Sequence, residues 1–128
     1  MTPELLHLDT IFLVRALAVG TSESRRLGEW LEQSALLGLS VIAWAEFLCG
    51  PLDDEQVELA LAVVGEPVPL SANDAKLAAR LFNTTGRRRG SLPDCLIAAT
   101  AIRTGATLAT SNPQDFKRFE ANGLTLAV

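Results

Sequence analysis

The stretch LPDCLIAATAIRTGATLAT, residues 92–110, decides the fold class of this chain. Its first part, residues 92–104, is predicted to be a helix, and the absence of charge over residues 95–102 predicts that this helix is buried on all sides. Gly105 then ends the helix, and residues 106–110 form a short apolar run that is typical of a buried strand. A buried helix that leads directly into a buried strand is typical of α/β proteins.

The same alternation of strand-like and helix-like segments continues toward both ends of the chain. Further strands are predicted at residues 5–8, 39–42 and 124–128, with a short edge strand at 68–70. Further helices are predicted over residues 11–17, 22–37, 43–49, 54–64, 71–85 and 113–122. Strands that alternate with helices imply a mainly parallel sheet that is covered by helices on both faces. We therefore expect an α/β fold in one domain over residues 1–128.

The composition excludes several classes of protein. A hydrophobic content of 48% over 128 residues is enough to form a core, so intrinsic disorder is excluded as the main state. The longest stretch without a charged residue, 33–45, is shorter than the roughly 20 apolar residues of a membrane-spanning helix. The first residues lack the basic segment of a signal peptide, so we expect a cytoplasmic protein with no membrane association.

The two cysteines and the single histidine exclude several familiar catalytic and metal sites. Cys49 and Cys95 lie among apolar residues without CxxC spacing, and they are predicted to be free, buried thiols. His7 lies in an apolar run and is predicted to be a core residue with satisfied hydrogen bonds. One histidine cannot form a His-rich zinc site, and no Gly-x-Ser-x-Gly elbow accompanies it to suggest a Ser-His-Asp triad.

Four acidic residues occupy positions where an α/β fold binds its ligands. In an open parallel sheet, ligands bind beyond the carboxyl ends of the strands, where the amino termini of helices also point. Asp9, Glu46 and Asp115 each follow a predicted strand, and Asp94 opens a predicted helix. Carboxylates that converge from several strand ends and helix starts would supply the oxygen ligands that Mg²⁺ or Mn²⁺ prefers.

Helix capping is the alternative explanation for three aspartates. A pattern that resembles a capping box, with Asp in place of the usual Glu, occurs at Ser71-x-x-Asp74, Ser91-x-x-Asp94 and Asn112-x-x-Asp115. Asp74 is interpreted as a cap, because Lys76 and Arg80 give its helix a solvated face. Asp94 differs because its helix is predicted to be buried, so its carboxylate is expected near apolar surroundings, and Asp115 is intermediate between the two.

Glu46 cannot be explained as a cap, because apolar residues precede and follow it in VIAWAEFLC, residues 41–49. An unpaired carboxylate in such surroundings would protonate, pair with a base or coordinate a metal. Two interpretations of Glu46 therefore stay open, a metal ligand and a tertiary salt bridge to an arginine.

The net charge of −4 argues at first against a nucleic-acid partner. Two divalent cations held by the carboxylates would add four positive charges and bring the total to zero, since −4 + 4 = 0. The consecutive Arg87, Arg88 and Arg89 could also bind phosphate, for which the planar guanidinium is suited. The alternative is that these arginines only solvate the end of the preceding helix.

Four segments, taken in order, resemble the signatures of PIN-domain ribonucleases, most closely the VapC-type toxins of prokaryotic toxin–antitoxin pairs. They are LDT (residues 8–10), AEF (45–47), PDCLIAATA (93–101) and TSNPQDF (110–116), and together they span nearly the whole chain. The resemblance implies a three-layer α/β/α sandwich and an endoribonuclease that depends on Mg²⁺ or Mn²⁺. It assigns Asp9, Glu46, Asp94 and Asp115 to a catalytic, metal-binding cluster. It assigns Ser111 and Asn112 as supporting polar residues.

The resemblance also implies a mechanism and partners. Water activated by metal would attack an RNA phosphodiester in line, which requires no histidine. A cognate small antitoxin whose basic residue enters the acidic site is expected, as is a homodimer formed through apolar helix faces such as that of Trp44, Phe47 and Leu48. Ser111 stands where many family members carry a basic residue, so a substrate contact at this position stays open.

Other function classes fit the sequence less well. An aspartyl-phosphate phosphatase needs Asp-x-Asp after its first strand, and Asp9-Thr10-Ile11 does not match. A receiver domain needs an acidic pair early in the chain and a lysine soon after the strand at 106–110, and both are missing. Two alternatives remain open, an RNA-processing nuclease outside a toxin system and a non-catalytic PIN-like interaction module. The presence of all four acids favours an enzyme.

Overall fold

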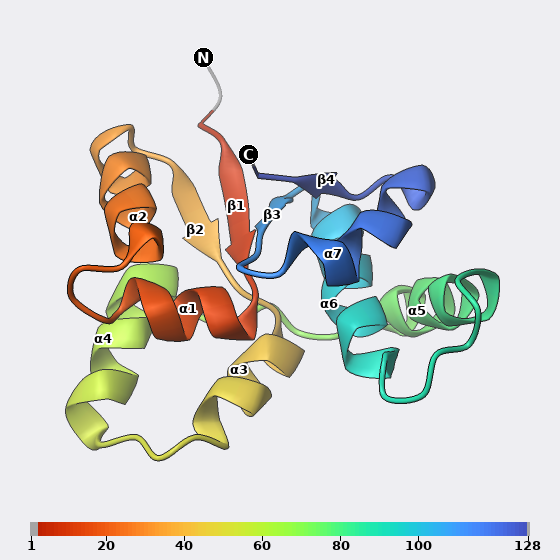
Figure 1. Ribbon diagram of the computed structural model, residues 1–128, viewed down its shortest axis with the longest axis horizontal. Helices are drawn as coiled ribbons and strands as arrows, with labels where there is room; N and C mark the ends of the chain where they lie inside the picture. Colours follow the sequence, from red (N-terminus) through yellow and green to blue (C-terminus); the bar gives the residue numbers. More distant parts are fainter. Residues whose placement is uncertain (1–2, 128) are drawn as a thin grey trace.

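A four-stranded, all-parallel sheet forms the centre of the computed structural model, which describes residues 3–127 (Figure 1). The strand order is β2-β1-β3-β4, and the strands are β1 (Leu5–Leu8), β2 (Leu36–Gly38), β3 (Thr107–Ala109) and β4 (Thr125–Leu126). In the register of the central pairs, Leu6 of β1 lies opposite Leu37 of β2, and His7 lies opposite Leu108 of β3. The first strand of the chain therefore lies inside the sheet, and its carboxyl end is surrounded by other elements.

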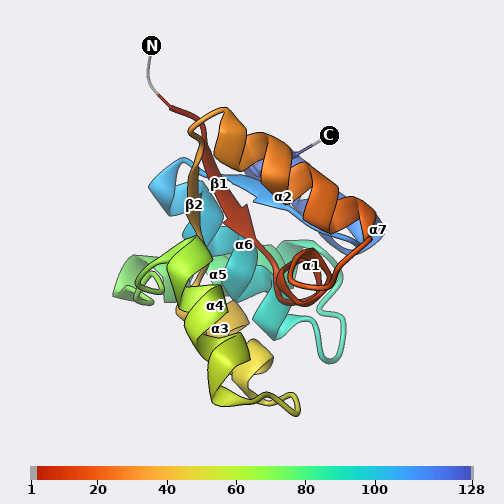
Figure 2. The same cartoon turned by 90° about the vertical axis from the view of Figure 1, so that its left-hand side faces the viewer.

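Every connection between successive strands contains helices. They are α1 (Thr10–Ala16) and α2 (Ser22–Glu32), then α3 (Val41–Leu48), α4 (Asp54–Val64), α5 (Ala72–Thr84) and α6 (Leu92–Thr104), and finally α7 (Pro113–Phe116) with the 3₁₀ helix η1 (Lys117–Asn122). A parallel connection needs such a crossover, and the crossovers place helices on both faces of the sheet, as Figure 2 shows. The predicted α/β/α sandwich with a parallel sheet is confirmed.

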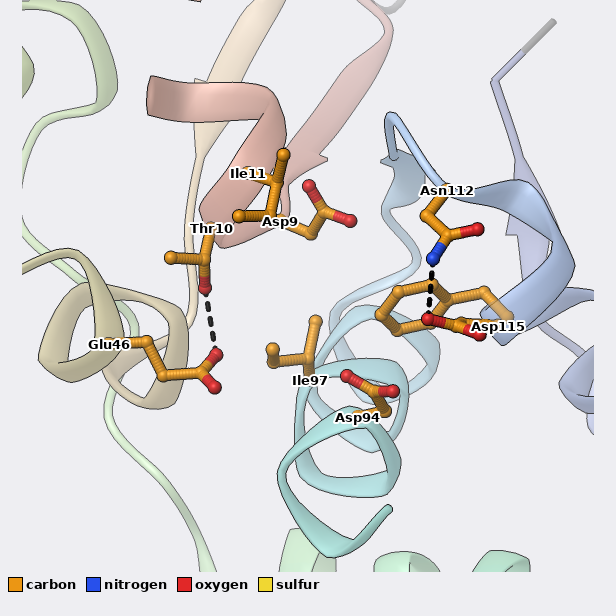
Figure 3. Close-up of a pocket in the computed structure, with 9 residues that line it drawn as sticks. Asp9, Thr10, Ile11, Glu46, Asp94, Ile97, Asn112 and Asp115 are labelled. Carbon is orange, nitrogen blue, oxygen red and sulfur yellow. Dashed lines mark hydrogen bonds between the residues drawn. The ribbon is translucent and has the colours of Figure 1, made fainter. Parts of the chain in front are cut away.

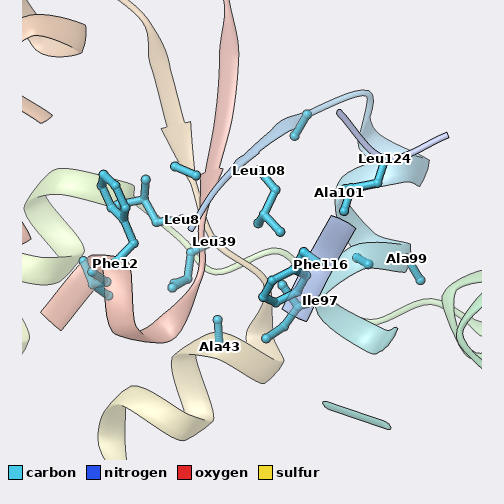
Figure 4. Close-up of a cluster of buried hydrophobic side chains, with 14 of the residues drawn as sticks. Leu8, Phe12, Leu39, Ala43, Ile97, Ala99, Ala101, Leu108, Phe116 and Leu124 are labelled. Carbon is cyan, nitrogen blue, oxygen red and sulfur yellow. The ribbon is translucent and has the colours of Figure 1, made fainter. Parts of the chain in front are cut away.

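The core lies between the sheet and the helices and contains mostly aliphatic side chains (Figure 4). Leu8 of β1 and Leu108 of β3 are fully buried, and Phe12 of α1 stacks on Trp30 of α2 with ring centroids 5.5 Å apart. Helix α6 has the predicted bounds, and a continuous run of its residues from Ile97 to Ala101 is buried. This explains why its sequence carries almost no charge. Asp94, in the first turn of α6, consequently lies at the edge of the core.

Two strand predictions are wrong in position or extent. Residues 39–42 do not form a strand, because Ser40 caps α3 by accepting a hydrogen bond from the Ala43 N–H (3.1 Å) and the helix begins at Val41. The strand lies earlier, at β2, because α2 ends at Glu32 rather than continuing to residue 37. The edge strand predicted at 68–70 is reduced to one bridge between Ser40 and Val68.

Near the carboxyl terminus, the helix predicted over 113–122 is divided into α7 and η1, and the last strand covers only Thr125–Leu126. The final residue of the strand predicted at 124–128 lies outside the described residues.

The cysteine and histidine predictions are confirmed only in part. Cys95 is buried, but Cys49 is exposed because it is the C-cap residue at the surface end of α3. His7 is buried in the core as predicted, and burial lowers its pKa to about 4. Its Nδ1 has no hydrogen-bond partner among the residues that the structure describes, so the prediction of satisfied hydrogen bonds is wrong. None of the described helices is long and apolar enough to cross a membrane.

Candidate active site

The four predicted acids line one cavity of about 340 Å³, which we call the acidic pocket (Figure 3). Asp9 follows β1, Glu46 comes from α3, Asp94 from the first turn of α6 and Asp115 from the first turn of α7. The remaining lining residues are Thr10, Ile11, Ile97, Asn112 and Phe116. Figure 3 shows the four carboxylates arranged around a common space, although the residues come from four separate elements.

Asp9 has both a structural role and a place in the pocket. It is the N-cap residue of α1, and its Oδ1 accepts a hydrogen bond from the Phe12 N–H (2.8 Å). Its Oδ2 accepts a hydrogen bond from the Thr110 hydroxyl. Burial raises the pKa of Asp9, and the negative charges of Glu46 and Asp115 add to this increase, while the two hydrogen bonds oppose it.

Glu46 is exposed, which contradicts the expectation that it is buried. Helix α3 turns Ala43 and Phe47 toward the core, and Glu46 lies on the side of the helix that faces the pocket. Its Oε1 accepts a hydrogen bond from the Thr10 hydroxyl (2.8 Å). The alternative of a salt bridge to an arginine is not observed within residues 3–127.

Asp94 does not cap its helix, because the Ser91 hydroxyl donates to the Arg88 carbonyl (2.7 Å) and forms no capping bond. Burial raises the pKa of Asp94 to about 6, and the nearby charge of Asp115 contributes to the increase. The guanidinium of Arg118, with Nη2 4.0 Å from Asp94 Oδ2, opposes this increase. The Nε and Nη1 atoms of Arg118 are buried and have no hydrogen-bond partner among the described residues.

Asp115 does not cap its helix either. Its Oδ2 accepts a hydrogen bond from Nδ2 of Asn112 (2.6 Å), and the Asn112 side chain makes no capping bond to α7. The Asn112 side chain therefore binds an acid of the pocket instead of capping a helix.

Asp74 is the one capping residue among the three Ser/Asn-x-x-Asp patterns. It forms a reciprocal capping box with Ser71, as predicted. The expectation of a solvated position is wrong, because Asp74 is fully buried and its Oδ1 accepts a hydrogen bond from the Arg103 Nε (2.6 Å). Burial alone would raise the pKa of Asp74, but the hydrogen bonds from Arg103 and the Ser71 backbone hold it below its ordinary value.

Residues 110–112, which we call the donor turn, provide three successive side-chain donors. The Thr110 hydroxyl binds Asp9, the Asn112 amide binds Asp115, and the Ser111 hydroxyl between them binds Oε2 of Glu23 (2.7 Å). The Ser111 hydroxyl therefore binds a residue outside the acidic pocket, and Ser111 is not among the residues that line this pocket. Sequence reasoning missed Glu23, because its position after Ser22 at the start of α2 resembles an ordinary first-turn acid.

Arg87, Arg88 and Arg89 are exposed and lie in the loop between α5 and α6. None of the three lines the acidic pocket. Helix α5 ends at Thr84, so the arginines are beyond the helix end rather than in its last turn.

The donor set of the pocket suits a hard divalent cation, because it consists of carboxylate oxygens. Burial raises the pKa of Asp9 and Asp94, and repulsion between the carboxylates adds to this increase. No group of three or more His, Cys, Asp or Glu side chains within the described residues is close enough together to hold a metal ion. Mg²⁺ commonly uses one or two carboxylates and keeps several waters, so it does not need a preformed cluster of three. The residues present therefore fit a cation that is bound partly through water.

In a comparison with known protein families, the chain matches the PIN domain over residues 6–122. A search among curated proteins found no match. Among solved structures, the chain is similar to one in the structure of VapBC2 from Rickettsia felis bound to a DNA fragment from the promoter. The two share 26% sequence identity with a TM-score of 0.77, and the match covers 96% of this chain and 97% of the other.

Two more distant matches show likeness of fold alone. One is to FitAcB from Neisseria gonorrhoeae, with 22% identity, a TM-score of 0.69 and coverage of 95% of this chain and 96% of the other. The second is to VapBC-1 from nontypeable Haemophilus influenzae, with 22% identity, a TM-score of 0.69 and coverage of 96% of both chains.

Proposed function

Because the chain belongs to the PIN-domain family, we propose that it is a divalent-metal-dependent endoribonuclease, a single PIN-like domain that acts in the cytoplasm. The observation that carries the proposal is the acidic pocket, in which Asp9, Glu46, Asp94 and Asp115 surround one cavity. These four residues are proposed as the catalytic and metal-binding set, with Mg²⁺ or Mn²⁺ as the cofactor. Such a set is expected of an enzyme that hydrolyses phosphodiesters without a histidine.

The charge of the pocket supports the need for a cation. Four carboxylates around a cavity repel a phosphodiester, so an RNA backbone can approach only where positive charge is supplied. A bound divalent cation lowers the pKa of water and neutralises charge that develops on the phosphate. Among Asp9, Glu46, Asp94 and Asp115, one or two carboxylates would hold this cation directly and the others through bound water. Burial around Asp94 strengthens its attraction for positive charge.

Hydrogen-bond donors keep the carboxylates oriented. Thr110 fixes Asp9, Thr10 fixes Glu46, and the amide of Asn112 fixes Asp115. Each of these carboxylates retains lone pairs for a further ligand, because a carboxylate oxygen can accept more than one hydrogen bond. Ile97 and Phe116 line the same cavity with apolar surface, which reduces the access of bulk water to the reacting groups.

Arg87, Arg88 and Arg89 are proposed to bind the RNA backbone outside the pocket. The nearest of them, Arg89, precedes Asp94 by only five residues in the sequence, since 94 − 89 = 5. Ser111 is proposed as a supporting residue through Glu23, rather than as a substrate contact.

The test is cleavage of a labelled RNA under three conditions. The protein is assayed with Mn²⁺, then with EDTA, and then after Mn²⁺ has been added back in excess of the EDTA. Asp94→Asn should abolish cleavage, whereas Asp54→Asn, an exposed first-turn aspartate of α4, should leave it unchanged. Full activity in EDTA, with no metal found by elemental analysis, would contradict metal dependence. Absence of both cleavage and Mn²⁺ binding in the wild-type protein would favour a non-catalytic interaction module instead.

We further propose that the chain is the toxin of a toxin–antitoxin pair, with a small cognate antitoxin as its partner and a homodimer as its own state. The likeness to chains of VapBC and FitAcB structures supports this proposal. Exposed apolar side chains on α1, α3 and α4 also support it, because Val14, Leu48 and Leu59 are each about half exposed. Two of them, Val14 and Leu59, line an apolar cavity of about 260 Å³ between these helices.

Two measurements test the toxin proposal. Expression of the chain should arrest growth, and co-expression of the adjacent small gene product should relieve the arrest. The isolated chain should be a dimer by light scattering. A strict monomer that is harmless when overexpressed would instead favour an RNA-processing nuclease outside a toxin system.

A further inference from the structure

We infer that Glu23, which lies outside the acidic pocket, is a positioning residue that acts on this pocket through Ser111. The consequence for catalysis rests on the proposed function, whereas the structural link itself does not. Glu23 is not among the residues that line the acidic pocket. It lies instead in the wall of a separate cavity of about 590 Å³ on the other side of the donor turn, a cavity that Ser111 also lines.

Glu23 is buried and held by several partners. Its side chain is 10% exposed, its Oε1 accepts a hydrogen bond from the Ser22 hydroxyl (2.9 Å), and its Oε2 accepts one from the Ser111 hydroxyl (2.7 Å). The guanidinium of Arg15 on α1 adds a charged contact at 3.7 Å. The hydrogen bond from Ser111, with smaller contributions that include the Arg15 charge, lowers the pKa of Glu23. The residue is therefore an ionised, fixed acceptor at neutral pH.

This acceptor controls the middle residue of the donor turn. The Asn112 N–H donates to the Thr110 hydroxyl oxygen (3.0 Å), so the turn is connected internally. The Thr110 hydroxyl in turn donates to Asp9, and the Asn112 amide donates to Asp115. A movement of Ser111 would therefore displace both neighbouring donors and the carboxylates that they orient.

A role of Glu23 in helix packing alone would have different consequences from a role in positioning the donor turn. Glu23 also joins α2 to α1 through Arg15, and loss of that contact alone would weaken helix packing without moving the donor turn. The two roles can be separated, because the contact to α1 comes from Arg15, which is 59% exposed, whereas the link to the donor turn is the hydrogen bond from Ser111.

The experiment compares Glu23→Ala, Ser111→Ala and the double variant with two controls. Glu29→Ala removes the same charge from an exposed position of the same helix, and Arg15→Met removes only the contact to α1. The first measurement is the ¹⁵N–¹H signal of the Asn112 side-chain amide in metal-free protein. The second is the dissociation constant for Mn²⁺ by electron paramagnetic resonance, and the third is the melting temperature.

Glu23→Ala and Ser111→Ala should each shift the Asn112 amide signals and weaken Mn²⁺ binding about tenfold, in the range known for residues that orient metal ligands. The double variant should bind Mn²⁺ no more weakly than either single variant, because each single substitution already removes the same hydrogen bond between Glu23 and Ser111. Glu23→Gln should restore much of the wild-type signal, since its amide oxygen can accept from Ser111. Glu29→Ala and Arg15→Met should leave the Asn112 signals and the Mn²⁺ affinity unchanged.

The inference is overturned if Glu23→Ala lowers the melting temperature but leaves the Asn112 signals in place, or if Arg15→Met moves those signals equally. If the wild-type protein binds no Mn²⁺, the proposed metal-dependent function fails. The amide signals then still decide whether Glu23 holds the donor turn.

Discussion

Replacing Asp94 by Asn should stabilise the metal-free protein at neutral pH and have almost no effect in acid. Burial and the charge of Asp115 raise the pKa of Asp94 from its ordinary 3.8 to about 6. A carboxyl group with a raised pKa in the folded state contributes stability below its unfolded pKa, and this contribution is lost as the pH rises through the folded value. An asparagine does not ionise and therefore keeps its contribution at neutral pH.

The magnitude follows from the same pKa values. A difference of about two pH units, at about 1.4 kcal/mol each, corresponds to ~3 kcal/mol for ionising Asp94 inside the fold at pH 7. The side chain is 30% exposed, so solvent screens part of the unfavourable interaction and ~3 kcal/mol is an upper bound. We expect a gain of about 1–3 kcal/mol for Asp94→Asn at pH 7.

The assay is urea denaturation in EDTA at a series of pH values between 4 and 7.5, followed by circular dichroism. The difference in unfolding free energy between Asp94→Asn and wild type should increase from near zero around pH 4 to its full value above the pKa of about 6. Asp54→Asn, at an exposed helix start, should show a flat and small difference. A destabilised Asp94→Asn protein at pH 7, or a difference that does not change with pH, would refute the reasoning.

Further predictions concern the metal, the ion pair between Asp74 and Arg103, and the three consecutive arginines. Mn²⁺-dependent cleavage should increase as the pH rises past about 6, the pKa of Asp94, because protons compete with the cation for this carboxylate at lower pH. The raised pKa of Asp9 acts in the same direction. A rate that is constant from pH 5 to 7.5 would contradict this. Asp74→Ala should lower the unfolding free energy by about 3 kcal/mol, because it leaves Arg103 without its buried partner and removes a helix cap. Chemical denaturation measures this loss. An unchanged denaturation midpoint would show that the ion pair is not stabilising. The last prediction concerns the affinity of Asp94→Asn protein for single-stranded RNA. Changing Arg87, Arg88 and Arg89 to Ala should make the slope of log affinity against log salt shallower by about 0.7 for each lost phosphate contact. An unchanged slope would show that these arginines only solvate the loop after α5.

The positions of the four acids could be predicted because they depend on chain topology. An acid that follows a buried strand or begins a buried helix must lie at the carboxyl edge of a parallel sheet, whatever the details of packing. Asp9 and Asp94 follow this rule directly. The buried helix α6 could also be predicted to the residue, because its uncharged interior is bounded by Ser91 and Gly105.

The surroundings of the acids could not be predicted, because they depend on contacts between distant segments. Ser111 and Glu23 are 88 residues apart in the sequence, and Thr110 and Asp9 are 101 apart. No local pattern identifies such partners. Glu46 shows the related limit, since neighbouring apolar residues suggested burial whereas its place on the helix surface determines its exposure.

The double role of Asp9 has an evolutionary consequence. The residue is both the N-cap of α1 and part of the acidic pocket, so a chain that loses it loses part of its fold together with its site. Asp94 caps nothing, and its replacement should make the metal-free protein more stable. If selection for activity were relaxed in a lineage, we expect Asp94 to be substituted early and Asp9 to persist. Inactive descendants of such a gene would then keep an aspartate after the first strand as a remnant of the lost pocket.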